Sequence, residues 1–112
     1  MKLTSVIFYT KNIEAVKDFY LTVFKLKIDI DTPNYISFDL GNGITLGIKL
    51  SSEPREIPGS QTMYLTVEDV EESFDKFKSL NCKFAKELTK ETWAYEFAIY
   101  DPDKNKIIIK QS

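Results

Sequence analysis

The two halves of the chain carry the same order of predicted elements, and this internal repeat limits the fold more than any other feature of the sequence. Each half reads as a strand, a helix and three further strands. Moving one half onto the other by about 57 positions superposes Asn12 on Asp69 and Tyr20 on Phe77. Two unrelated amphipathic helices with acidic first turns would also superpose, so the order of elements carries the comparison. The sequence predicts an α+β fold of two βαβββ modules in tandem.

The first module is predicted in residues 1–50. A β-branched and aromatic run in residues 3–9 has the composition and length of a strand. Asn12 then precedes apolar residues at helical spacing, so it is the expected N-cap of a helix. Three short strands follow in residues 27–31, 35–40 and 44–50. The last two are joined by Gly41-Asn42-Gly43, because glycine accepts the positive φ angles of tight hairpins.

Residues 51–60 contain two prolines and one glycine and are predicted to be a linker before the second module, residues 61–112. A strand in residues 61–67 leads to Asp69, the expected N-cap of a helix that carries Val70, Phe74, Phe77 and Leu80 on one face. The remaining strands are expected at 83–88, 93–100 and 106–110. Residues 101–105, Asp-Pro-Asp-Lys-Asn, form a turn between the last two.

Composition excludes several classes of protein. A chain of 112 residues with 43% hydrophobic residues can form a single folded domain, residues 1–112, without disulfides. The 15 basic and 17 acidic residues are spread along the chain, which argues against a nucleic-acid partner. No apolar run has the length of a membrane span and no signal-peptide pattern opens the chain, so we expect no membrane partner and a cytoplasmic location. The chain has no histidine, the commonest metal ligand and acid-base residue.

Two segments resemble the vicinal oxygen chelate superfamily, which includes glyoxalase I, bleomycin-resistance proteins and extradiol dioxygenases. One is Asn12-Ile13-Glu14 followed by Phe19-Tyr20; the other is residues 97–105, which end in a turn similar to the Asp-Pro-Asp-Gly-Asn of the family, with Lys104 in place of glycine. The resemblance implies the glyoxalase/bleomycin-resistance fold, in which eight strands form an open cavity with the helices outside. By analogy with the resistance proteins it also implies a homodimer.

Metal-dependent members of this superfamily take their ligands from the first and last strands of each module. Carrying these positions over by motif gives Ser5, Gly47, Thr62 and Ile108. Glycine and isoleucine have no side-chain donor, and neutral hydroxyls bind divalent transition metals poorly. We therefore expect no metal ion and no cofactor.

The same register predicts which side chains face the cavity, because a strand alternates its faces. Tyr35, Tyr64, Trp93 and Tyr100 either line the cavity or lie in a subunit contact. The complete set of predicted ligand-binding residues is Ser5, Ile7, Tyr9, Tyr35, Ser37, Asp39, Gly47, Lys49, Thr62, Tyr64, Trp93, Glu96, Ala98, Tyr100 and Ile108.

The sequence shows no recognisable catalytic set. Asp39 and Glu96 either act as paired carboxylates that favour a cationic ligand, or lie near exposed strand ends paired with lysines. Cys82 is expected to be a packing residue, because no histidine exists to activate it. We expect a metal-independent protein that binds, and sequesters, a cationic or aromatic small molecule. The alternatives are a lyase, isomerase or dioxygenase with a metal ion on Asp39 and Glu96, and a metabolite-sensing or interaction module.

Overall fold

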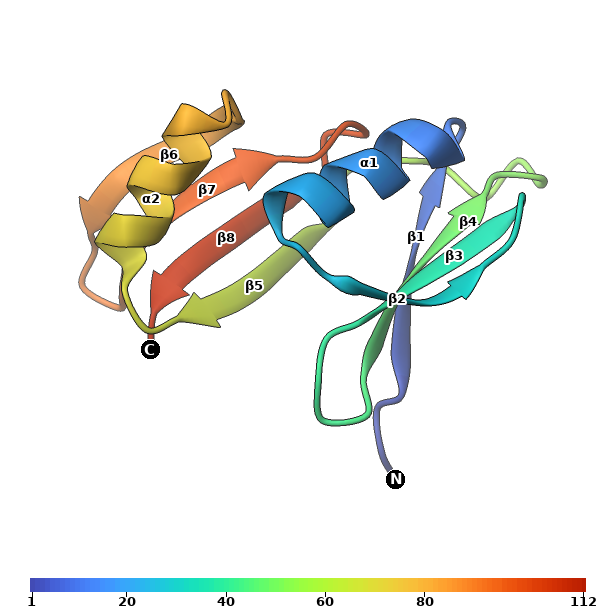
Figure 1. Cartoon of the computed structure of the whole chain (residues 1–112), viewed down its shortest axis with the longest axis horizontal. Helices are drawn as coiled ribbons and strands as arrows, with labels where there is room; N and C mark the ends of the chain where they lie inside the picture. Colours follow the sequence, from blue (N-terminus) through green and yellow to red (C-terminus); the bar gives the residue numbers. More distant parts are fainter. The chain divides into compact units, whose positions relative to one another are not determined.

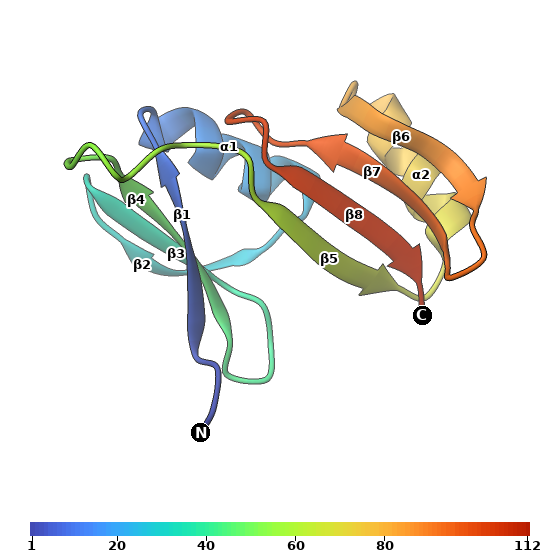
Figure 2. The ribbon, with the colours of Figure 1, turned by 180° about the vertical axis from the view of Figure 1, so that it is seen from behind.

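The computed structural model describes residues 1–112, which divide into two compact units, Met1–Gly59 and Ser60–Ser112. Each unit contains one helix and a four-stranded sheet, and the helix lies on one face of its sheet (Figures 1 and 2). The predicted α+β fold of tandem βαβββ modules is confirmed. The first unit consists of β1 (Ser5–Thr10), α1 (Ile13–Val23), β2 (Lys27–Asp31), β3 (Tyr35–Asp39) and β4 (Thr45–Leu50). The second consists of β5 (Thr62–Val67), α2 (Val70–Ser79), β6 (Lys83–Lys90), β7 (Tyr95–Tyr100) and β8 (Lys106–Gln111).

The two sheets have the same topology. Their strand orders are β1-β4-β3-β2 and β5-β8-β7-β6. In each sheet the first strand pairs in parallel with the last, and the other neighbours are antiparallel. A parallel pair needs a long crossover connection, and each helix with the two strands that follow it provides that connection.

The helices begin and end in matching ways. The Asn12 side chain accepts a hydrogen bond from the Ala15 amide at 3.2 Å, and the Asp69 side chain accepts one from the Glu72 amide at 3.1 Å. Both predicted N-caps are therefore confirmed. After the helices, Lys25 and Asn81 adopt positive φ angles of 52° and 58°. The chain turns away at these left-handed residues, as it does at many helix C-termini.

The core of each unit lies between its helix and one face of its sheet. In the first unit, the Tyr20 ring of α1 lies 5.7 Å from the Phe38 ring of β3. In the second unit, the Phe74 and Phe77 rings of α2 lie 5.4 Å and 5.8 Å from the Phe97 ring of β7. Burial of large apolar side chains of this kind contributes about 1.5–3 kcal/mol for each residue. Neither helix is long and apolar enough to cross a membrane.

Residues 91–94 correct the prediction for the β6–β7 connection. The Glu91 amide donates to the Ala94 carbonyl at 2.8 Å, which closes a tight turn. β6 therefore continues to Lys90, and β7 begins at Tyr95 rather than at Trp93. Leu80 also differs from the prediction, because α2 ends at Ser79 and leaves the Leu80 side chain 39% exposed.

The turn after β7 lies where the Asp-Pro-Asp motif predicts it, and the structure shows that the buried side chains of Asp101 and Asn105 hold it. The Asp101 carboxylate accepts hydrogen bonds from the backbone amides of Asp103 and Asn105 and from the Asn105 side chain, at 2.8–2.9 Å. The Asn105 side-chain oxygen in turn accepts from the Gln61 amide. The turn thus fixes the start of β8 to the segment that leads into β5. Lys104, where the resemblance expects glycine, adopts a φ of 67°.

Candidate functional site

Each sheet has one face that the helix of its own unit does not cover, which we call the open face. In the first unit, Lys17 of α1 forms a 2.9 Å salt bridge with Asp31, whose register partner is Ile36, so Ile36 lies on the helix side. The alternating residues lie on the open face. They form three rows across β1, β4 and β3: Ser5, Thr45 and Asp39; Ile7, Gly47 and Ser37; Tyr9, Lys49 and Tyr35.

Gly47 makes room for a tyrosine on this open face. A Cβ atom added at Gly47 would lie 2.9 Å from the Tyr35 Cζ atom, which is closer than real Cβ atoms approach. The Tyr35 ring therefore lies over the backbone of Gly47, and any side chain at this position would displace it. The absence of a side chain at position 47 shapes this face and also removes a possible ligand donor.

The polar groups of the Ser37 and Asp39 side chains are engaged by neighbouring backbone. Ser37 is buried, and its hydroxyl oxygen accepts a hydrogen bond from the Ile30 amide at the β2 bulge, at 3.1 Å. The exposed Asp39 carboxylate accepts from the Gly41 amide of the hairpin at 2.7 Å. Both groups therefore support local structure, and the Asp39 residue as a whole stays exposed.

Lys49 is bound to a residue that the sequence analysis assigned to the linker. Its ammonium lies 2.7 Å and 3.0 Å from the two carboxylate oxygens of Glu56. The buried Glu56 carboxylate also accepts hydrogen bonds from the Ser52 amide and hydroxyl. These donors, Lys49 first, lower the pKa of Glu56 to about 2. The Glu56 carboxylate is therefore ionised at neutral pH, and it balances the charge of the Lys49 ammonium within the protein.

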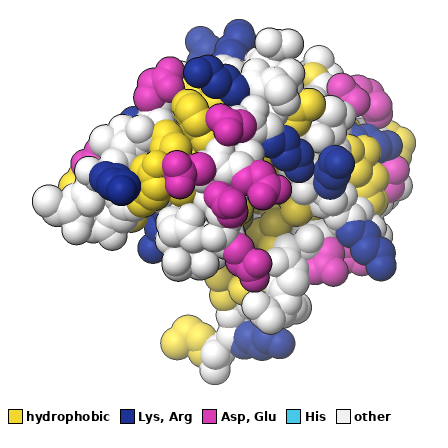
Figure 3. Space-filling model, turned by 60° about the vertical axis from the view of Figure 1, so that its left-hand side comes forward, with side chains coloured by type: hydrophobic (Ala, Val, Ile, Leu, Met, Phe, Trp, Pro, Cys, Tyr) yellow, Lys and Arg dark blue, Asp and Glu magenta, His cyan; other side chains and the backbone are white.

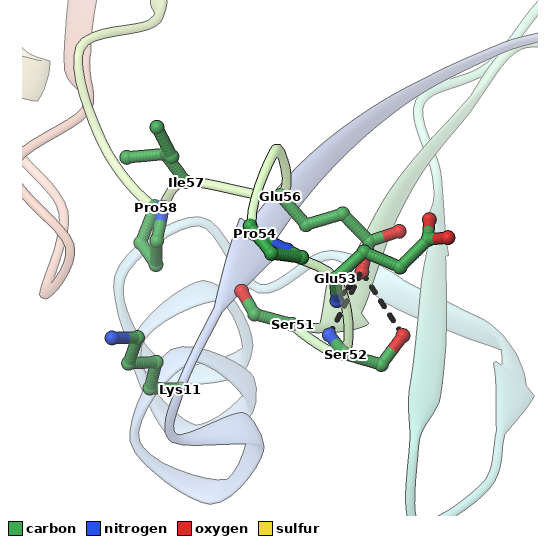
Figure 4. A pocket seen from close by; sticks show the side chains of 8 residues that line it. All are labelled: Lys11, Ser51, Ser52, Glu53, Pro54, Glu56, Ile57 and Pro58. Atoms are coloured by element: carbon green, nitrogen blue, oxygen red, sulfur yellow. Dashed lines mark hydrogen bonds between the residues drawn. The ribbon is translucent and has the colours of Figure 1, made fainter.

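A small cavity of about 350 Å³ lies beside this ion pair (Figure 4). The Ser51 hydroxyl is buried there without a hydrogen-bond partner. The lining residues are Lys11, Ser51, Ser52, Glu53, Pro54, Glu56, Ile57 and Pro58. The segment predicted as a linker is thus folded against the end of the first sheet.

The open face of the second unit repeats the same register. Its rows across β5, β8, β7 and β6 are Thr62, Lys106, Tyr100 and Lys83; Tyr64, Ile108, Ala98 and Lys86; Thr66, Lys110, Glu96 and Thr89. Glu96 therefore corresponds to Tyr35 of the first unit, and Ile108 corresponds to Gly47. The prediction that the two open faces line one cavity stays a prediction.

Glu96 is buried in an ion pair. One carboxylate oxygen lies 2.7 Å from the Lys86 ammonium, and the other accepts a hydrogen bond from the Trp93 indole at 3.1 Å. The bond to Glu96 raises the pKa of Lys86. Of the two alternatives for Glu96, the structure therefore matches the carboxylate that is paired with a lysine. The expected exposed strand end is not found, because Glu96 is only 2% exposed.

Three aromatic residues of the predicted set are exposed in the second unit. Tyr64 is 52% exposed on β5, and the Lys110 ammonium lies 5.9 Å from its ring centroid. Trp93 is 65% exposed and lies in the 91–94 turn rather than on a strand. Tyr100 is exposed at the end of β7. Large aromatic groups left open to solvent are characteristic of contact and binding surfaces.

The four positions that the resemblance in sequence assigns to metal ligands do not fit a metal ion here. Ser5 and Thr62 each provide one neutral hydroxyl on the first strand of a sheet, and Gly47 and Ile108 provide no donor. No group of three or more Cys, Asp or Glu side chains is arranged to hold an ion elsewhere in the chain.

Cys82 follows α2 and is partly buried. Burial raises the pKa of its thiol, which disfavours the nucleophilic thiolate. This environment agrees with a packing role.

Sequence reasoning did not identify Glu56 or Lys86 as partners of predicted site residues. Glu56 lies among prolines and polar residues that signal a loop, and its burial depends on a fold of that loop. Lys86 reaches the open face because bulges interrupt β6 on both sides of it. A glutamate seven residues after a lysine, or a lysine in a lysine-rich strand, gives no specific signal of pairing.

Comparisons with known proteins agree with this architecture. A model of the glyoxalase-like domain matches residues 3–112. No curated protein matches the chain in sequence.

Several solved structures share the fold at low sequence identity. TnmS3, an antibiotic binding protein from Streptomyces sp. CB03234, is 20% identical, with a TM-score of 0.87 over 99% of this chain and 95% of the other. A lactoylglutathione lyase from Agrobacterium tumefaciens is 19% identical, with a TM-score of 0.81 over 99% and 93%. A member of the glyoxalase/bleomycin resistance protein/dioxygenase superfamily from Sphaerobacter thermophilus DSM 20745 is 19% identical, with a TM-score of 0.86 over 100% and 98%. At identities this low the likeness shows a common fold, and both binding proteins and enzymes adopt this fold.

Proposed function

Because the chain belongs to the glyoxalase-like domain family, we propose that it binds a small organic molecule on the open faces of its sheets, without a metal ion. The molecule is held by aromatic rings and hydroxyl groups and is sequestered rather than converted.

The observation that carries this proposal is the residue set at the superfamily's metal positions. Gly47 and Ile108 occupy the same register position in their units, and neither has a side-chain oxygen, nitrogen or sulfur atom. Ser5 and Thr62 remain, and two neutral hydroxyls are a poor donor set for a divalent transition metal. The aromatic groups around these positions remain suited to an organic ligand.

The environment of Glu96 also favours binding over metal-assisted catalysis. An alternative enzyme would use Asp39 and Glu96 as unusual metal ligands. The Glu96 carboxylate already accepts from Lys86 and Trp93, so a metal ion would have to displace a buried ion pair. Removal of the Lys86 partner would leave an uncompensated charge, which is costly.

The related structures agree with either outcome, since one is an antibiotic binding protein and another a lactoylglutathione lyase. We favour a binding protein, because the residues at the four expected metal positions are poor metal ligands.

Binding and metal content are testable on the same sample. Full-length protein is purified without chelator, its metal content is measured by mass spectrometry, and a library of metabolites and aromatic drugs is then screened by thermal shift in the presence of EDTA. We expect well below one metal ion for each protein chain. We also expect at least one compound to raise Tm, because a ligand that binds only the folded state stabilises it.

Two variants locate the binding. Tyr35→Ala and Tyr64→Ala each remove a ring from an open face, so at least one should reduce the shift in Tm caused by the compound. Leu80→Ala is the control, because Leu80 is 39% exposed and follows α2, outside the sheets and outside the cavity beside Glu56. A stoichiometric metal ion, or binding that is unaffected by both tyrosine variants, would contradict the proposal.

A further inference from the structure

The open face of the second unit carries a clear excess of positive charge. Among its twelve register positions, four are lysines and one is an acidic residue. The acidic residue, Glu96, is already paired with Lys86 at 2.7 Å, and Glu91 of the β6–β7 turn lies 3.6 Å from the same ammonium, so the other three lysines make up the excess. The lysines are Lys83, Lys86, Lys106 and Lys110. An anion that approaches this face therefore meets lysine ammonium groups and no unpaired carboxylate from these positions.

The first unit does not share this excess. On its open face Asp39 pairs across the sheet with Lys27, so the two opposite charges are neighbours. Lys49 is neutralised by the buried Glu56. The equivalent of Lys49 in the second unit is Lys110, and its ammonium lies over the Tyr64 ring instead of in an ion pair with a linker glutamate. The same register position therefore holds a lysine in an ion pair in the first unit and a lysine over an aromatic ring in the second.

The lysines flank an apolar centre. Ile108 and Ala98 are paired in the middle row of this face and are only 9% and 1% exposed, so Tyr64 beside Ile108, 52% exposed, provides the accessible apolar surface of the row. Lys106 and Lys110 lie two residues before and after Ile108 on the same strand, so their Cα atoms are about 13 Å apart at the usual rise of a strand. A flat apolar ring stacked on Tyr64 would have an ammonium group within reach at either end, since Lys106 and Lys110 lie in the rows before and after it.

The exposed tyrosines add the second element of recognition. Tyr64 and Tyr100 are 52% and 37% exposed and lie in adjacent rows of the same face. Their rings can stack on an aromatic ligand, while the lysines pair with its acidic group.

We propose that the open face of the second unit selects an aromatic molecule that carries a negative charge, such as an aromatic carboxylate or a phenolate. This inference rests on the proposed binding function and names the ligand class for it. It replaces the sequence-based expectation of a cationic ligand, which treated the Glu96 carboxylate as unpaired.

The test uses three probes with the same ring and different charge: 1-naphthoate, 1-naphthylmethylamine and 1-naphthylmethanol. Each is titrated into the full chain in EDTA at low and at moderate salt, and binding is followed by amide chemical shifts. We expect 1-naphthoate to bind about tenfold more tightly than the amine, with shift changes at residues 62–66 and 106–110. Salt should weaken the binding of 1-naphthoate and leave that of the neutral alcohol nearly unchanged.

Charge-removing variants separate electrostatic recognition from simple apolar contact. Lys106→Gln and Lys110→Gln should each weaken binding of 1-naphthoate several-fold without changing binding of 1-naphthylmethanol. Lys76→Gln, an exposed lysine on α2, is the matched control and should change neither.

The outcomes distinguish this inference from the proposed function. If the amine binds as tightly as the acid, or if the shifts occur only outside the second sheet, the charge assignment is wrong while small-molecule binding stands. If no probe binds, the aromatic-anion assignment is also wrong, and the library screen decides the proposed function separately.

Discussion

Lys104 is in a backbone conformation that suits glycine, and replacing it should stabilise the protein. Its φ is 67°, in the left-handed region where the Cβ of an L-residue crowds the following carbonyl. The turn does not allow it to relax, because the Lys104 amide donates to the Asp101 carbonyl at 3.0 Å and the Asp101 amide donates to the Asn105 carbonyl at 3.0 Å. The Lys104→Gly variant removes the Cβ and leaves these backbone bonds in place.

The size of the effect follows from two opposing contributions. The left-handed conformation costs a residue with a Cβ about 1–2 kcal/mol. Glycine gains freedom in the unfolded chain, which lowers stability by about 0.4–1 kcal/mol. The net gain in the free energy of unfolding is about 0.5–1 kcal/mol. With an unfolding entropy of roughly 2.1 cal/mol/K for each residue, this gain raises Tm by about 2–4 °C for a chain of this length.

The assay is thermal unfolding followed by circular dichroism, with urea unfolding as a second measurement. Lys104→Ala is the control, because it removes the charge but keeps the Cβ and hence the strain. We expect Lys104→Gly to raise Tm and Lys104→Ala to leave it within about 1 °C. An equal rise in both variants would show that charge, and not backbone conformation, limits stability here. A fall in Tm for Lys104→Gly would refute the reasoning outright.

Three further predictions concern single contacts. Gly47→Ala should cost about 1 kcal/mol by displacing the Tyr35 ring, and chemical denaturation should show no such loss in a Tyr35→Ala background. Glu56→Gln should lower Tm at neutral pH; since the folded-state pKa of Glu56 is about 2, below its ordinary value of 4.5, the wild-type advantage should shrink as pH falls from about 5 toward 2, and an advantage independent of pH would contradict this. Asn12→Ala should cost about 1 kcal/mol through the lost N-cap, whereas Asn12→Ser should retain most of the stability in urea unfolding.

The overall surface charge gives little guidance about the ligand, whereas the individual charged residues of one sheet face do. Figure 3 shows acidic, basic and hydrophobic side chains interspersed on the face that it draws. The net charge of −2 describes the whole chain, whereas the ligand class proposed above depends on one face of one sheet. The difference arises because salt and water screen distant charges, so a bound molecule responds mainly to the groups within several ångströms.

Features that depend on near neighbours along the chain could be predicted from the amino-acid sequence. Asn12 and Asp69 cap the helices through amides three residues away, and the 101–105 turn is closed by its own side chains. The alternation of β1 and β7 likewise follows from strand geometry, which places Phe8 and Phe97 in the cores. These interactions need only a local conformation, so a residue pattern is sufficient to predict them.

The pairing of charges, and hence which lysines remain available to a ligand, could be seen only in the folded structure. In β6 the bulges place Lys83, Lys86 and Thr89 on the open face at a spacing of three, where strict alternation would not. The ion pair between Lys86 and Glu96 depends on that irregular register, and the pair between Lys49 and Glu56 depends on the folding of residues 51–58. Ion pairs of this kind form between segments whose separation in space is fixed by hydrogen bonds across strands and loops. That separation cannot be predicted from the residue pattern.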